Sequence, residues 1–165
     1  MVDLSADKKE HLHIVMRHLQ KPLLLSDFHS LINEQSPELI ELYALGCRLD
    51  IDIFKRLSVW AYQQAVYYMA YDITHEYAWL TNHTKFSRVM MKLGSFVEVL
   101  YSPESDIPTD DQQLRPPLLQ LAAWVHQLLT KDEQKEEFDR VLEVSGTFAR
   151  ELLDHIKSVM TSNHL

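Results

Sequence analysis

Nine histidines among 165 residues are the side chains most able to do chemistry in this sequence, because a histidine beside a carboxylate can bind a metal ion or transfer a proton. Three such pairs stand at the spacing of neighbours on one helix face: Glu10–His13, Asp72–His75 and Glu151–His155. Helical bundles that hold two metal ions use carboxylate–histidine pairs of this kind. A site of that type requires that the pair faces the interior of the protein.

The three pairs differ in the side of the helix on which helical geometry places them. At about 100° per residue, the carboxylates of the first and third pairs point away from the apolar sides of their segments. We therefore expect Glu151 and His155 to form a solvated pair. Asp72, His75 and the adjacent Glu76 instead share the apolar side of their segment.

Asp72, His75 and Glu76 are therefore the candidates for a metal or catalytic site. Burying a polar group without a hydrogen-bonding partner costs about 2–7 kcal/mol, so a buried group of three would need partners from another helix. His126 and His29 are the candidate further ligands. Two other interpretations remain open: the helix ends before these residues and exposes them, or they form a purely structural hydrogen bond.

Sharper enzyme motifs are absent from the sequence. His75-Glu76 begins the His-Glu-x-x-His pattern of zinc proteases, but Trp79 stands where the second histidine belongs. Three scattered glycines form neither a phosphate-binding loop nor a dinucleotide-binding turn. The lone Cys47 lies in an apolar segment, where a cysteine usually serves packing. We therefore expect no cofactor.

Arg150 and His155 stand five positions apart in the last apolar segment. The run Arg150-Glu-Leu-Leu-Asp-His155 resembles the Arg-x4-His motif of HEPN-type ribonucleases. That resemblance implies an arginine and a histidine from paired helices around an RNA phosphate. The residue after Arg150 is acidic, where those enzymes commonly carry another polar residue, and an acidic chain repels RNA. A ribonuclease using Arg150 and His155 is one alternative function.

Aromatic residues crowd the segment from residue 60 to residue 79. On one helix they cannot all face a single core stripe, so some must lie at a second packed face or at an interface. Tyr62 and Tyr67 point to well-separated sides of that helix. Tyr62, Tyr67 and Tyr71 are therefore the candidate contacts with a partner protein or another subunit.

The elements that must position these residues are helices. Glycine occurs only three times, which is too few for the turns of a sheet protein, and most of the six prolines lie where helices should start or stop. Apolar residues recur at helical spacing along the chain. The sequence predicts an all-α, compact multi-helix bundle of about seven helices, with one long central helix from about Asp52, in a single domain over residues 1–165.

Several boundaries can be predicted as well. Ser36-Pro37-Glu38 is a strong helix start, and Gly46 is the expected end of that helix. Residues 102–113 contain four acids, two prolines and no base, which predicts a solvated loop. The last helix should begin near Asp132 and bend at residues 145–147.

The formal charge of −8 disfavours binding to phosphate backbones and to anionic lipid surfaces. No uncharged apolar run approaches the ~18 residues of a membrane span, and a single cysteine suits a reducing compartment. We therefore expect a cytoplasmic protein that binds neither nucleic acid nor membranes.

These features favour a non-enzymatic helical module that binds another protein, as an adaptor, chaperone-like, immunity or regulatory factor. A homo-oligomer is the second kind of partner that the aromatic segment allows. A metal- or small-ligand-dependent helical-bundle enzyme centred on Asp72, His75 and Glu76 is the alternative from another class, beside the ribonuclease.

Overall fold

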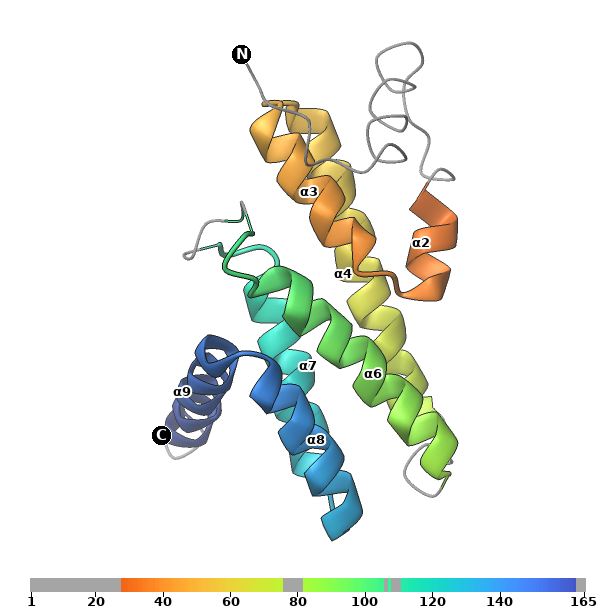
Figure 1. The fold of residues 1–165 in the computed structure, drawn as a ribbon, viewed down its shortest axis with the longest axis vertical. Helices are drawn as coiled ribbons and strands as arrows, with labels where there is room; N and C mark the ends of the chain where they lie inside the picture. Colours follow the sequence, from red (N-terminus) through yellow and green to blue (C-terminus); the bar gives the residue numbers. More distant parts are fainter. Residues whose placement is uncertain (1–27, 76–81, 106, 108–110, 163–165) are drawn as a thin grey trace.

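Helices build the whole of the described fold (Figure 1). The computed structural model describes residues 28–75, 82–105, 107 and 111–162, and within these ranges it contains no strand. The helices are α2 (His29–Glu34), α3 (Glu38–Arg48), α4 (Asp52–His75), α6 (His83–Leu100), α7 (Arg115–Leu128), α8 (Asp132–Val144) and α9 (Gly146–Ser162). Over the described residues, the prediction of an all-α bundle of about seven helices is confirmed, and α4, with 24 residues, is the longest of these helices.

α3 and α4 form a close helical pair near the start of the described chain. Gly46 was expected to end α3, but it lies inside the helix, which continues to Arg48. A Cβ atom at Gly46 would lie 3.1 Å from Cδ1 of Phe54 and 3.2 Å from the backbone nitrogen of Lys55. Gly46 therefore serves the close approach of α3 to α4, and Asp50, with a φ of 53°, lies in the turn that follows α3.

One continuous apolar core joins α4 to α6 and α7. Tyr62 of α4 packs against Phe96 of α6 with 5.6 Å between ring centroids. Met69, Leu93 and Leu118 add fully buried side chains from the three helices. Within the described part of the chain, none of the helices combines the length and apolar character needed to cross a bilayer.

The last predicted helix is in fact two helices. α8 ends at Val144 and α9 begins at Gly146, and the two run in different directions (Figure 1). Ser145 between them is extended, with φ −149° and ψ 116°. Its hydroxyl oxygen accepts a hydrogen bond from the backbone N–H of Phe148 at 3.3 Å, so Ser145 caps α9. An extended residue with a capping side chain breaks the helix instead of bending it.

The acidic loop is less solvated than its composition indicated. Ile107 and Asp111 are both buried. Asp111 Oδ1 accepts hydrogen bonds from the backbone N–H groups of Gln113, at 3.0 Å, and Leu114, at 2.6 Å. The prediction of a solvated loop is therefore wrong at these two positions, because the loop must return to the core to start α7.

Candidate functional site

One side of α4 exposes four large apolar side chains. Ile53 is 57%, Trp60 38%, Tyr67 61% and Tyr71 46% exposed. They are spaced seven, seven and four residues apart, which puts them within about 40° of one another around the helix. We call these four residues the α4 strip. Phe54, Ala61, Ala65 and Met69 supply the buried side of the same helix.

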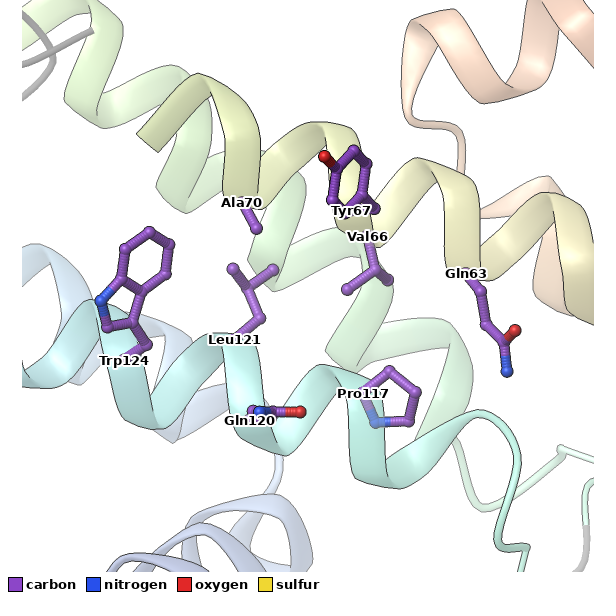
Figure 2. A pocket seen from close by; sticks show the side chains of 8 residues that line it. All are labelled: Gln63, Val66, Tyr67, Ala70, Pro117, Gln120, Leu121 and Trp124. Carbon is purple, nitrogen blue, oxygen red and sulfur yellow. The ribbon is translucent and has the colours of Figure 1, made fainter. Parts of the chain in front are cut away.

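The α4 strip borders a groove between α4 and α7 (Figure 2). The groove has a volume of about 540 Å³ and is lined by Gln63, Val66, Tyr67, Ala70, Pro117, Gln120, Leu121 and Trp124. Figure 2 shows Gln63 and Pro117 at one end of it and Ala70 and Trp124 at the other. Tyr67 belongs to both the groove and the α4 strip, so the two features form one continuous surface.

The walls of this groove carry no charged side chain. α4 has no acid between Asp52 and Asp72, and α7 has none from Arg115 to Leu128. The chain as a whole nevertheless carries a formal charge of −8. When a partner covers this groove, no charged side chain of the groove loses its water. The binding free energy is therefore not reduced by the large cost of desolvating a charge.

Arg115 fixes the start of α7, which is one wall of the groove. Its guanidinium Nη1 lies 2.8 Å from Oε1 of Glu151 on α9, and its Cζ lies 4.6 Å from the ring centroid of Tyr101. The Tyr101 hydroxyl donates to the other Glu151 oxygen at 2.7 Å. Burial and the neighbouring Glu151 raise the pKa of Tyr101, so its hydroxyl stays protonated and acts as a donor.

Asp111 connects the same region to α3. The Tyr43 hydroxyl donates a hydrogen bond of 3.0 Å to Asp111 Oδ2. Burial and the Asp111 carboxylate raise the pKa of Tyr43, and burial also raises the pKa of the nearby Cys47 thiol. Tyr43 and Cys47 are therefore held in their neutral forms, which suits a structural hydrogen-bond network and not a nucleophile.

Tyr62 was expected at an interface, but this expectation is wrong. Its side chain is fully buried, and its hydroxyl donates to the backbone oxygen of Leu114 at 2.8 Å. Burial raises its pKa well above the ordinary value. Tyr62 is a core residue, whereas Tyr67 and Tyr71 are exposed as expected for contacts.

Asp72 is exposed instead of buried, and it takes part in a polar link between helices. Its Oδ2 accepts a hydrogen bond of 2.8 Å from Nε2 of Gln35, whose Oε1 accepts one of 2.9 Å from Nζ of Lys92. Burial lowers the pKa of the Lys92 ammonium, and the Asp72 carboxylate opposes that shift. The link joins α4 to the end of α2 and to α6.

The other members of the predicted metal site cannot be placed beside Asp72. The side chain of His75 and the whole of Glu76 lie outside the described residues. His29 and His126, the candidate further ligands, are exposed, and the ring of His126 lies 5.7 Å from that of Phe138. Among the described residues there is no group of three histidine, cysteine, aspartate or glutamate side chains placed to hold a metal ion.

The Arg150 and His155 pair lies on α9. Arg150 is exposed and His155 is half-buried. Five helical positions turn the two side chains about 140° apart. Glu151 was expected to pair with His155 in solvent, and this is wrong, because the Glu151 carboxylate binds Arg115 and Tyr101.

A second groove lies between α6 and α8. It is lined by Ser87, Met90, Met91, Glu137, Arg140 and Val141 and is smaller, with a volume of about 290 Å³. Glu137 accepts a hydrogen bond of 2.9 Å from the Ser87 hydroxyl and lies 3.4 Å from Nδ1 of His83. Its charged lining makes it a weaker candidate than the α4/α7 groove for an apolar partner.

Sequence reasoning did not single out the α7 wall of the larger groove. Trp124 and Gln120 belong to a stretch without acids between Asp111 and Asp132, in a chain that has 24 acidic residues. This signal is not specific, because the stretch between Glu76 and Glu98 shares it. Only the packing of α7 beside α4 brings Trp124 and Tyr67 to one surface.

Comparison of the chain with protein-family models, with curated proteins and with solved structures finds no match.

Proposed function

We propose that this protein is a non-enzymatic module that binds another protein, and that a helix of that partner docks in the groove between α4 and α7. The observation that carries the proposal is the uncharged groove lined by Tyr67 and Trp124, continuous with the exposed α4 strip. Tyrosine and tryptophan, together with arginine, are enriched among the residues that dominate binding energy at protein interfaces.

The length of the surface favours a helix over a small molecule. From Ile53 to Tyr71 the α4 strip extends along eighteen helical positions, or about 27 Å. A small ligand in the groove would leave Ile53 and Trp60 exposed, whereas an amphipathic helix can cover apolar residues at this spacing along its whole length. The polar side-chain groups of the groove are the amides of Gln63 and Gln120, the Tyr67 hydroxyl and the Trp124 indole N–H, which can form hydrogen bonds with a partner.

The net charge of this chain limits which proteins could be its partner. A chain of formal charge −8 repels strongly acidic proteins and nucleic acids at long range. The proposed partner therefore has an apolar helix face without a row of acids. The proposal also places the protein in the cytoplasm.

A photo-crosslinking amino acid at Gln120 tests this proposal in cells that produce the full chain. Gln120 lines the groove, and Gln127, also exposed on α7 but outside the lining, is the matched control position. We expect a discrete protein adduct from Gln120 that is lost when Tyr67→Ala is added, and no such adduct from Gln127. The same adducts from both positions, or a Gln120 adduct that Tyr67→Ala leaves unchanged, would refute the proposal.

A further inference from the structure

α3 is the one described helix without an exposed residue. Every residue from Glu38 to Arg48 is buried or half-buried, whereas each of the other described helices exposes several side chains. Gly46 marks the side of α3 that approaches α4. Glu41, Ala44 and Arg48 are turned about 140–160° away from Gly46, and we call them the outer side of α3. Figure 1 shows α4 along one side of α3 and no described helix along the opposite side, so the burial of the outer side requires a covering segment outside the described residues.

The cover extends over charged side chains. Oε2 of Glu41 and Nε of Arg48 are buried atoms. Long charged side chains on a helix surface ordinarily keep their charged groups in water. Burying such groups is costly unless hydrogen bonds or opposite charges compensate. The segment that covers α3 should therefore carry charged side chains beside its apolar ones.

Of the ranges outside the described residues, only residues 1–27 are long enough to cover α3. With eleven residues, α3 is about 16 Å long. Each of the other ranges has at most six residues. Those ranges are 76–81, 106, 108–110 and 163–165.

The described chain also begins close to α3. Its first residue, Phe28, is buried, and its ring centroid lies 6.2 Å from that of Phe54. Phe54 is the side chain that α3 approaches, since a Cβ at Gly46 would lie 3.1 Å from its Cδ1. Residues 22–27 can span about 20 Å when extended, so the residues before them reach the outer side of α3 from this point.

The sequence of residues 8–21 fits this place. Its apolar residues recur at helical spacing on one stripe, and Pro22 ends the pattern. The segment has four basic residues and one acid, in a chain of formal charge −8. α3 carries the acids Glu38 and Glu41 in its first turn, so the two charges are complementary. The stripe consists of Leu12, Val15, Met16 and Leu19, and the basic residues are Lys8, Lys9, Arg17 and Lys21.

We propose that residues 8–21 form an amphipathic helix that packs on the outer side of α3, with Lys8 and Lys9 beside Glu38 and Glu41. These two lysines lie about one turn before Leu12 and flank the apolar stripe, so they are the bases closest to the contact. The contact lies within the chain and away from the α4 strip. The inference therefore does not rest on the proposed function, and it leaves the groove between α4 and α7 open to a partner.

Hydrogen–deuterium exchange of the full chain, read by mass spectrometry, tests this contact. Leu12→Asp puts an acid into the apolar stripe and should raise amide exchange in α3 by about tenfold or more, while exchange in α9 stays unchanged. Ile14→Asp is the matched control, because Ile14 is turned about 160° away from Leu12 and lies off the stripe. It should leave the exchange of α3 unchanged. Equal exchange of α3 in the two variants would overturn the inference.

Cross-linking of the natural chain tests the lysine–glutamate pairing without any substitution. A carbodiimide joins lysine amines directly to carboxylates that they contact, so it should link Lys8 or Lys9 to Glu38 or Glu41. Nζ of Lys135 and Oδ1 of Asp132 lie 3.3 Å apart at the exposed start of α8, and their link is the internal control. A mixture of chains with ordinary and with heavy nitrogen shows whether a link lies within one chain or joins two.

Links from Lys8 or Lys9 to α3 within one chain would support the inference. Links to α3 that only join two copies, or no link to α3 while the control link forms, would overturn it. If Leu12→Asp raises exchange in α9 as well, the substitution has destabilised the whole chain, and the cross-links of the natural chain decide.

Discussion

Nη1 of Arg115 lies 2.8 Å from Oε1 of Glu151, and this ion pair joins the first residue of α7 to α9. The guanidinium is largely buried and also lies over the Tyr101 ring. Because α7 forms one wall of the groove that contains Trp124, the pair connects the C-terminal helix to the candidate binding surface.

We expect Glu151→Ala to lower the free energy of unfolding by about 2–3 kcal/mol, because it leaves the Arg115 charge largely buried without its partner. Glu151→Gln should cost less, since the amide oxygen still accepts a hydrogen bond. Urea denaturation measures both. Arg150→Ala, at the adjacent exposed position, is the control and should change the free energy by less than about 0.5 kcal/mol. Equal effects of Glu151→Ala and Arg150→Ala would show that the ion pair contributes nothing.

The buried tyrosines predict a steep loss of stability in alkali. Burial raises the pKa values of Tyr43, Tyr62 and Tyr101 above the ordinary 10.0. Above pH 10 the unfolded chain releases three protons that the folded chain retains, so the free energy of unfolding falls as the pH rises. The fall should be about 1.4 kcal/mol per pH unit for each tyrosine, starting near pH 10 and continuing past pH 12.

Urea denaturation at a series of pH values from about 8 to 11 checks this slope. Tyr62→Phe should reduce this slope by the contribution of one tyrosine, whatever the substitution does to the free energy of unfolding at neutral pH. Phenolate absorbance that shows all three tyrosines ionised in the folded protein near pH 10 would contradict the expected pKa values.

Gly46 and Gly94 make a matched pair of helical glycines. In α3, a Cβ at Gly46 would lie 3.1 Å from Phe54 Cδ1, whereas in α6 the nearest neighbour of a Cβ at Gly94 is 3.9 Å away. Gly94→Ala should raise the free energy of unfolding by up to about 1 kcal/mol through helix propensity. Gly46→Ala should lower it by about 1 kcal/mol, because overpacking against α4 outweighs the same gain. Thermal and urea unfolding measure both, and equal stabilisation by the two substitutions would rule out the tight contact.

Gln35 and Asp72 should be energetically coupled. A double-mutant cycle with Gln35→Ala and Asp72→Ala should give a coupling of about 1 kcal/mol in the free energy of unfolding, the usual value for one hydrogen bond. Because the Gln35 amide already binds Asp72 Oδ2, we expect no metal ion at this oxygen. The coupling free energy should therefore be the same with and without the chelator EDTA. If EDTA destabilises the natural chain but not Asp72→Ala, the Asp72 carboxylate holds a metal ion instead.

The helical architecture could be predicted from local features of the sequence. The spacing of apolar residues, the scarcity of glycine and Ser36-Pro37-Glu38 act within a few residues, and they identified the helical class and the long α4. Errors arose where a local preference competed with a distant contact. Gly46 lies inside α3 where α4 approaches it closely, and the buried Asp111 accepts a hydrogen bond from Tyr43, 68 residues away.

The candidate site could be predicted only in part. An aromatic-rich central helix with candidate contact residues at Tyr67 and Tyr71 follows from composition and helical spacing, and both side chains are exposed. That they contact a partner stays a prediction. Helical angles alone did not reveal that Tyr62 faces the core and that Glu151 turns to Arg115.

The sequence by itself determined that this chain is a bundle of amphipathic helices with one long aromatic helix, because hydrophobic periodicity acts along a single element. Only the tertiary structure decided which sides of those helices face each other. It placed α7 beside the second half of α4, so that Trp124 and Tyr67 border one uncharged groove. The physical reason is that a groove is formed by the packing of elements distant in sequence. The hydrophobic periodicity of one helix shows which side is buried but not which helix packs against that side.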